Sequence, residues 1–136
     1  MNAERPGFIE VTIDMARPDE LPKIIGIYQQ HNGNCKDVGC QNTFVARDTS
    51  GVAVGAITIE KIQPGWVGLR TVGVEPGLQG RGIGSQLVSG VAERLRSEGN
   101  HSITVDLDIT KNQEGFYGNN SFKPLDSVSM VYKPED

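Results

Sequence analysis

The sequence predicts a single α/β domain built on one mixed β-sheet of six to seven strands, flanked by helices. Short segments with alternating apolar residues indicate strands, and two longer segments with apolar residues at helical spacing indicate helices. A strand–helix–strand succession around a glycine-rich turn requires a parallel pair, whereas tight turns make the earlier strands antiparallel. The 136 residues suffice for one hydrophobic core, so residues 1–136 are predicted to be one domain.

The N-terminal half is predicted to supply the antiparallel part of the sheet. In chain order the expected elements are a strand over 9–15, a helix between Asp19 and Asn32, and strands over 43–47, 52–62 and 66–74. The strands follow from apolar alternation, and the helix from an apolar stripe that begins behind a candidate N-cap, Asp19. The segment Cys35 to Gln41 is polar and contains glycine, so a loop is expected there.

The C-terminal half is predicted to contain the crossover helix and the remaining strands. The expected elements are a helix over 83–95, a strand over 102–109, a short helix over 113–119, and strands at Phe122 and over 128–132. The long helix carries its apolar residues on one stripe, and Gly99 suits the left-handed position that follows a helix. The strand 66–74 is expected to lie parallel to the strand 102–109.

A glycine-rich turn, Gln79-Gly80-Arg81-Gly82-Ile83-Gly84, separates the strand 66–74 from the long helix. Unpaired N–H groups and the helix dipole make such a turn a binding site for a phosphate or pyrophosphate. Glycine tolerates positive φ there, and it has no Cβ to keep the phosphate away from the amides. The turn lacks the third glycine of the dinucleotide fingerprint and the lysine of the P-loop. Arg81 is expected to add positive charge.

The Q-x-x-G-x-G pattern of Gln79, Gly82 and Gly84, with Val74 and Pro76 before it, resembles the acyl-CoA signature of the GCN5-related N-acetyltransferases (GNAT superfamily). The order of elements is also that of the family, so the resemblance covers nearly the whole chain. It implies acetyl-CoA as cosubstrate, with the pyrophosphate on the turn and the pantetheine arm on the free edge of the strand 66–74. An amide of that edge would polarise the thioester carbonyl. The cofactor-binding residues implied are Val72, Val74, Gln79, Gly80, Arg81, Gly82, Ile83, Gly84 and Ser85.

Residues 116–122 resemble a second GNAT pattern, F-Y-x-x-x-G-F, with Ser121 in place of the glycine. The resemblance implies that Tyr117 lies near the sulfur of coenzyme A and protonates the leaving thiolate. A phenol with a pKa of about 10 can donate to a developing thiolate with a pKa of about 8.5. The alternative is a tyrosine packed in the core. The family asparagine that often contacts coenzyme A would fall at Thr110, so the nearby Asn112 is taken as the candidate contact.

The sequence leaves the general base open. Many relatives place a glutamate on the strand before the turn, but residues 66–74 contain no acid. Glu60 is one candidate, and Asp106 and Asp108 are others because they share one face of the predicted strand 102–109. Each of these acids fits equally well on a solvated strand face, or as a group that attracts a cationic acceptor.

Composition restricts the classes of partner. A hydrophobic content of 37% and a charged content of 22%, without a membrane-span or signal-peptide pattern, predict a cytoplasmic globular protein with no membrane partner. The net charge of −4 argues against nucleic-acid binding and favours a cationic acceptor. Cys35 and Cys40, with His31 nearby, lack a fourth zinc ligand, so reduced thiols and no metal are expected. A homodimer is a family-level expectation.

The resemblance therefore predicts an N-acetyltransferase that moves an acetyl group from acetyl-CoA to a primary amine, a small cationic molecule, by direct attack in a ternary complex. Two alternatives stay open. One is a non-catalytic acyl-CoA-binding or sensor module, which the missing base and the displaced asparagine favour. The other is a protein acetyltransferase acting on lysines or N-termini. The loop Asn32 to Gln41 is expected to decide between a closed pocket and a peptide groove.

Overall fold

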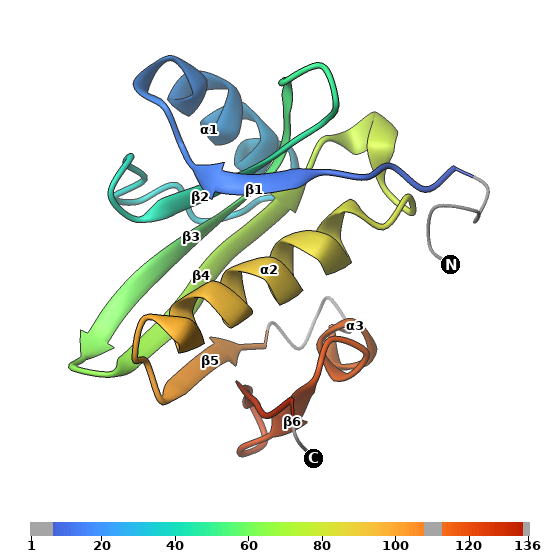
Figure 1. Cartoon of the computed structure of the whole chain (residues 1–136). Helices are drawn as coiled ribbons and strands as arrows, with labels where there is room; N and C mark the ends of the chain where they lie inside the picture. Colours follow the sequence, from blue (N-terminus) through green and yellow to red (C-terminus); the bar gives the residue numbers. More distant parts are fainter. Residues whose placement is uncertain (1–6, 108–112, 135–136) are drawn as a thin grey trace.

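The computed structural model describes residues 7–107 and 113–134, and its strands form one seven-stranded sheet (Figure 1). The strands are β1 (Thr12–Met15), β2 (Thr43–Arg47), β3 (Ala53–Gln63), β4 (Trp66–Val74), β5 (Ser102–Asp106), β6 (Phe122–Pro124) and β7 (Ser129–Tyr132). They lie in the order β1-β2-β3-β4-β5-β7-β6. Only β4 and β5 pair in parallel, and the other neighbours are antiparallel. The predicted mixed sheet with its parallel pair is confirmed.

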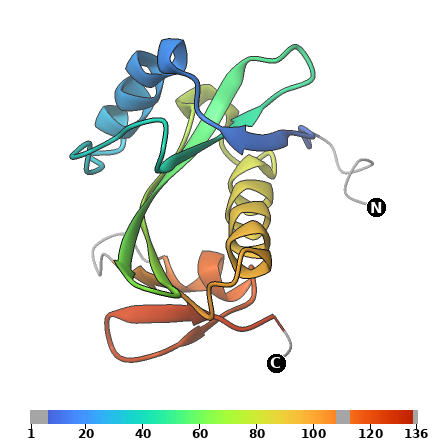
Figure 2. The same cartoon turned by 60° about the vertical axis from the view of Figure 1, so that its left-hand side comes forward.

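Two helices, α1 (Leu21–Gln30) and α2 (Ile83–Ser97), cover opposite faces of the sheet (Figure 2). Each helix packs on its own apolar cluster, because neighbouring residues of a strand point to opposite faces. Val45 of β2 thus packs in the α1 cluster, whereas Phe44 belongs to the α2 cluster. A short helix, α3 (Glu114–Gly118), precedes β6. None of the helices in the described ranges has the length and apolar character that crossing a bilayer requires.

The first strand is shorter than the sequence predicts, because the residues before Thr12 pair with another part of the chain. The Ile9 N–H donates to the Arg81 carbonyl oxygen at 3.0 Å. The Val11 N–H donates to Gln86 Oε1 at 3.1 Å. The lead-in to β1 is therefore tied to the glycine turn and to the first turn of α2.

The predicted N-cap, Asp19, does not cap α1. Residues Pro18–Glu20 form a 3₁₀ turn, η2, and α1 begins at Leu21. The Arg17 N–H donates to Glu20 Oε1 at 2.8 Å, so the carboxylate that organises this turn is that of Glu20. The partner that holds Glu20 in place comes from β2, 27 positions along the chain, and no local pattern identifies it.

Arg47, the last residue of β2, forms a buried ion pair with Glu20. Its Nε and Nη2 donate to the two oxygens of the Glu20 carboxylate at 2.9 and 2.8 Å. The two side chains are only 7% and 11% exposed. The Arg47 Nη2 also donates to the Met15 carbonyl oxygen at 3.1 Å, which joins the start of α1 to the edge of the sheet. The hydrogen bond from Arg47 holds the pKa of Glu20 below its ordinary value.

We expect the protein to lose stability as the pH falls below the ordinary glutamate pKa of 4.5. A carboxylate whose pKa is lowered by folding stabilises the native state above its unfolded pKa, and this contribution is lost as the pH falls through the folded pKa. Urea unfolding at decreasing pH should show the decline. Glu20→Gln should be less stable at neutral pH and should depend less steeply on pH. Parallel pH dependences for the two proteins would contradict this expectation.

Ser121 stands where the GNAT pattern has glycine, and its φ of 71° lies in the left-handed region. A side chain in that region costs about 1–2 kcal/mol, which glycine avoids. Glycine also loses more conformational entropy on folding than serine does, and this offsets part of the stabilisation. We therefore expect Ser121→Gly to raise the free energy of unfolding by about 0.5–1 kcal/mol in urea titrations. Ser127→Gly is the control, because Ser127 is also exposed but has no positive φ. The prediction is wrong if both substitutions have the same effect.

Candidate acetyl-transfer site

The glycine turn ends at Gly82, the N-cap residue of α2. Its φ of 85° lies in the left-handed region that glycine tolerates, and no side chain caps the helix. The first N–H of this end to bond within the helix is that of Gln86, which donates to the Gly82 carbonyl oxygen at 3.1 Å. The N–H groups of residues 83–85 therefore emerge at the helix start without a capping side chain. This arrangement suits an anion.

The strand before the turn has a free edge. β4 and β5 pair only from Trp66 opposite Ser102 to Leu69 opposite Val105. Beyond that point β4 continues to Val74 with β3 as its only neighbouring strand in the described part of the sheet. The Glu75 N–H donates to β3 at 2.9 Å, whereas the Val74 carbonyl oxygen faces away from β3 and contacts His31. The N–H and C=O of one strand residue point to the same edge, so the Val74 N–H also faces the gap. The splayed pair is confirmed.

A cleft of about 490 Å³ joins the turn to this free edge, and we call it the cofactor cleft. Its lining includes the predicted residues Val72, Val74, Gln79, Gly80, Gly82, Ile83, Gly84 and Ser85, together with His31, Gly73, Leu78 and Phe116. Arg81 is exposed and does not line the cleft, and its main-chain oxygen accepts the Ile9 N–H. Asn112 lies outside the described residues.

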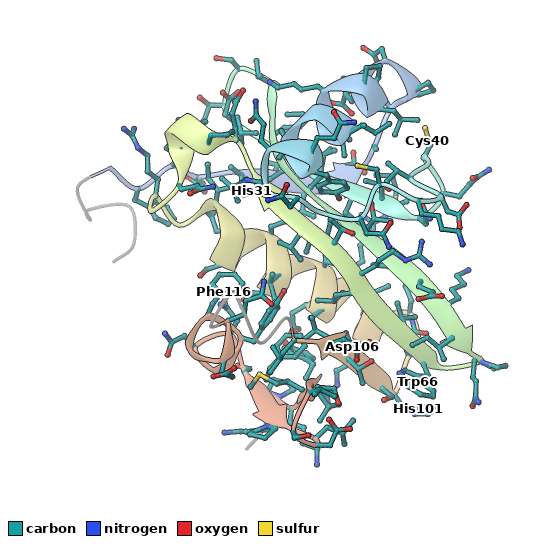
Figure 3. All side chains as sticks on the ribbon, turned by 180° about the vertical axis from the view of Figure 1, so that it is seen from behind. His31, Cys40, Trp66, His101, Asp106 and Phe116 are labelled. Carbon is teal, nitrogen blue, oxygen red and sulfur yellow. The ribbon has the colours of Figure 1, made fainter. Side chains whose placement is uncertain are left out.

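His31, which follows α1, is a cleft residue that sequence reasoning did not find. Its Nε2 lies 2.7 Å from the Val74 carbonyl oxygen and 3.2 Å from Gln79 Nε2. A carbonyl oxygen only accepts, so Nε2 carries the hydrogen and donates it to Val74. Figure 3 shows the ring beside β4. Cys35 and Cys40 are free thiols, and the described part of the chain holds no group of three or more potential ligands placed for a metal.

The two aromatic residues of α3 have different surroundings. Phe116 lines the cleft, and its ring would lie 3.4 Å from a Cβ added to Gly84. Tyr117 is 3% exposed and packs edge-on against Phe116 and Phe122 in the core. Burial raises the pKa of Tyr117 to about 12. Complete proton transfer to a thiolate with a pKa of about 8.5 would then be uphill by roughly 5 kcal/mol.

Asn120, a buried residue that follows α3, fixes α3 against the start of α2. Its Nδ2 donates to the Phe116 carbonyl oxygen at 2.8 Å and to Ser85 Oγ at 3.3 Å. Its Oδ1 accepts from Ser89 Oγ at 3.0 Å. The amide therefore sets the position of the Phe116 ring relative to the free N–H groups of the helix start.

A second cavity, of about 760 Å³, lies on the sheet at the other part of β4, and we call it the sheet-face cavity. Its lining residues are Asn34, Lys36, Glu60, Ile62, Trp66, Gly68, Leu69, Arg70, Thr104 and Asp106. Along β4 it reaches Arg70, and the cofactor cleft begins at Val72, so Thr71 alone separates them on this strand. Figure 3 labels Trp66 and Asp106, two of the lining residues on the neighbouring strands β4 and β5.

Two of the predicted base candidates meet in the sheet-face cavity. The Glu60 carboxylate pairs with Arg70 Nη2 at 3.1 Å, so a cation already neutralises it. Asp106 is exposed at the end of β5, and no residue in the described ranges forms an ion pair with it. Asp108 lies outside the described residues. Of the candidate bases that the structure describes, Asp106 is therefore the one whose carboxylate has no cation from the described residues paired with it in the cavity.

The family model for the acetyltransferase (GNAT) family matches residues 10–119. The chain belongs to the GNAT acetyltransferase family. It is therefore an acyltransferase that uses acetyl-CoA. No curated protein sequence matches the chain.

Solved GNAT structures share the fold. A GNAT acetyltransferase from Brucella melitensis in complex with acetyl-CoA has a TM-score of 0.68 at 22% identity, over 90% of this chain and 86% of that one. Rv2747 from Mycobacterium tuberculosis, in complex with CoA and NLQ, has a TM-score of 0.73 at 22% identity, over 85% and 73%. YhbS from Escherichia coli, in complex with CoA, has a TM-score of 0.65 at 17% identity, over 94% and 83%.

Proposed function

We propose that this GNAT protein acetylates a small primary amine by direct attack in a ternary complex. One observation carries the proposal: the free N–H groups at the start of α2, the free edge of β4 and the sheet-face cavity follow one another from the helix start along β4. The diphosphate would rest on the N–H groups of residues 83–85, and the pantetheine arm would lie along Val72 to Val74. The thioester then reaches the level of Thr71, beside the cavity from which the amine approaches.

The reaction forms a C–N bond and breaks a C–S bond. One proton leaves the amine nitrogen, and one is taken up by the departing sulfur. The neutral amine nitrogen bonds to the thioester carbon, the C–S bond breaks, and coenzyme A leaves as a thiolate that takes up a proton. An N–H of the free β4 edge at the level of the thioester polarises the carbonyl. An alkylammonium with a pKa of about 10 must first lose its proton, directly or through water. Glu60, Asp106 and Asp108 stay the candidate bases, and the unpaired position of Asp106 favours it.

The loop after α1 supports a small acceptor rather than a peptide. Thr71 Oγ1 donates to the Asn34 carbonyl oxygen at 2.8 Å, and Arg70 Nη1 donates to the Lys36 carbonyl oxygen at 3.0 Å. These bonds hold the loop against β4, where Asn34 and Lys36 form one wall of the sheet-face cavity. A groove for an extended peptide would require this wall to open.

The proposal is tested by a thiol-release screen with acetyl-CoA over amines, amino acids, polyamines, aminoglycosides and peptides. We expect release with a subset of the small amines and calorimetric binding of both acetyl-CoA and free CoA. No heat with either ligand at millimolar concentration would refute the proposal at its first step. Labelling of peptides as well as small amines would refute the choice of acceptor.

A non-catalytic acyl-CoA sensor is the second candidate. The pairing of Glu60 with Arg70 and the burial of Tyr117 favour it, because both reduce the catalytic groups available in the described residues. This candidate predicts CoA binding with no thiol release above background from any amine in the panel. Turnover with a single acceptor rejects it.

Tyr117→Phe measures the contribution of the phenol. If Tyr117 donates to the leaving sulfur, kcat should fall by about a hundredfold while acetyl-CoA affinity is retained, because the ring still fills its place in the core. With its pKa raised to about 12, Tyr117 should also add no descending limb to the pH–rate profile at lower pH. Tyr132→Phe is the matched control, since the Tyr132 hydroxyl bonds to Glu93 on the surface. An unchanged kcat in Tyr117→Phe would contradict the acid role.

A further inference from the structure

Arg70 occupies the point at which β4 and β5 separate. Thr58 of β3 pairs with Thr71 and Ile59 pairs with Leu69, so Arg70 is an extra, bulged residue of β4. The pairing with β5 also ends at Leu69, opposite Val105. The side chain of Arg70 follows the alternation of Trp66 and Gly68, which line the same cavity. The guanidinium therefore lies in the sheet-face cavity, at the end nearest the cofactor cleft.

The Arg70 guanidinium has unused hydrogen-bond donors. Its side chain is 18% exposed. Nη1 donates to the Lys36 carbonyl oxygen at 3.0 Å and lies 3.8 Å from Asp37 Oδ2, and Nη2 lies 3.1 Å from Glu60 Oε2. A guanidinium carries more N–H groups than these contacts use, and Nε is without a partner in the described residues. The fork therefore has donors left for a further planar acceptor such as a carboxylate.

A negative group lies across the gap from Arg70. The last paired residues are Leu69 of β4 and Val105 of β5. Arg70 and Asp106 are therefore the first residues beyond the pairing on their two strands. Neighbouring strands lie about 4.8 Å apart where they pair, and here they begin to diverge. Both side chains line the sheet-face cavity, yet Arg70 pairs with Glu60 and Asp37 instead of Asp106. The two opposite charges leave between them a space that a ligand can bridge.

One wall of the cavity is apolar and fixed. Trp66 Nε1 donates to Thr104 Oγ1 at 2.9 Å, which holds the indole on the sheet. Ile62 lies in the same lining. The cavity thus combines an apolar surface with charges of both signs, those of Lys36, Arg70, Glu60 and Asp106. A polyamine or a simple alkylamine has no acceptor group and would leave the free donors of Arg70 unpaired.

We propose that the acceptor is a zwitterionic amino acid, whose carboxylate binds Arg70 and whose amino group lies between Asp106 and the thioester. This rests on the acetyl transfer proposed above, and it replaces the purely cationic acceptor that the net charge suggests. A partly buried site that uses a charged fork for one substrate group discriminates strongly against analogues without that group.

The test compares amino acids with the amines that lack the carboxylate: phenylalanine with phenethylamine, tryptophan with tryptamine, and lysine with cadaverine. Binding to the CoA-saturated protein is measured by calorimetry, and turnover by thiol release. At least one amino acid should bind about tenfold tighter than its amine. Arg70→Gln should abolish that difference without changing the affinity for CoA. Arg70→Lys keeps the charge but not the forked guanidinium, and it should reduce the difference in affinity between the amino acid and its amine. Lys123→Gln removes an exposed charge on β6 and should leave this difference unchanged.

Equal affinities for the amino acids and the matching amines would overturn the inference. It would also be overturned if Arg70→Gln weakened the binding of the amino acids and of the amines by the same factor. Circular dichroism and CoA affinity establish that each variant is folded. The outcome also separates the two proposals. Binding that depends on the carboxylate and on Arg70, without thiol release, would support Arg70 as the carboxylate-binding residue and refute acetyl transfer to the bound amino acid. Thiol release without any preference for a carboxylate would support acetyl transfer and overturn the inference.

Discussion

Gly82→Ala should weaken acetyl-CoA binding by about a hundredfold, the largest functional effect that we expect from a single methyl group. At a φ of 85° an L side chain is strained, and the backbone relaxes by moving the N-cap and the N–H groups that follow it. Each hydrogen bond from these groups to a charged phosphate is worth about 1.5–3 kcal/mol, so losing one or two of them suffices. Titration calorimetry with acetyl-CoA measures the change.

Gly99→Ala is the matched control for this prediction. Gly99 follows the other end of the same helix, has a φ of 101°, and an added Cβ would meet nothing within 4 Å. Both substitutions should therefore lower the free energy of unfolding by a similar amount, about 1 kcal/mol. Only Gly82→Ala should lose acetyl-CoA affinity. Equal affinities in the two variants would show that the glycine turn does not hold the cofactor.

The largest effect on stability is expected for Arg47→Met, which should lower the free energy of unfolding by about 3 kcal/mol in urea titrations. The substitution removes both hydrogen bonds to Glu20 and leaves that largely buried carboxylate without its hydrogen-bonded cation. The cost is therefore the desolvation of an unpaired charge as well as the loss of the contact. Acetyl-CoA affinity should be unchanged under conditions in which the variant is folded, because the pair does not line the cofactor cleft.

Two variants test this explanation. Lys23→Met removes an exposed ion pair of 3.9 Å with Glu75, and it should change stability by less than about 0.5 kcal/mol. The double substitution Glu20→Leu with Arg47→Met removes both buried charges and should recover much of the loss. A double variant that is less stable than Arg47→Met alone would contradict the desolvation argument.

The elements that local patterns specify were predictable from the sequence. β4 has the predicted bounds, α2 begins at the predicted Ile83, and Gly99 has the expected positive φ. These features depend on alternation, helical spacing and the special conformations of glycine, all of which are written within a few neighbouring residues. The glycine turn belongs to this group, with the positive φ of Gly82 at the start of α2.

The features that long-range contacts determine were not predictable. His31 enters the cleft only because the end of α1 lies beside β4, and Glu20 organises η2 only because Arg47 reaches it. The five-residue α3 is too short for its periodicity to show that Phe116, rather than Tyr117, lines the cleft. Arg70 did offer a signal, as the one charged residue within the strand 66–74, but its position where β4 and β5 separate depends on the pairing of strands distant in sequence.

The proposed function depends above all on the N–H groups of Ile83, Gly84 and Ser85 binding the diphosphate of acetyl-CoA. The most direct measurement is a ¹H–¹⁵N NMR titration of the protein with acetyl-CoA. The account predicts that these three amide resonances shift together and saturate with the affinity found by calorimetry, and that the resonance of Gly99 stays in place. Saturable acetyl-CoA binding that leaves the three resonances unmoved would contradict it.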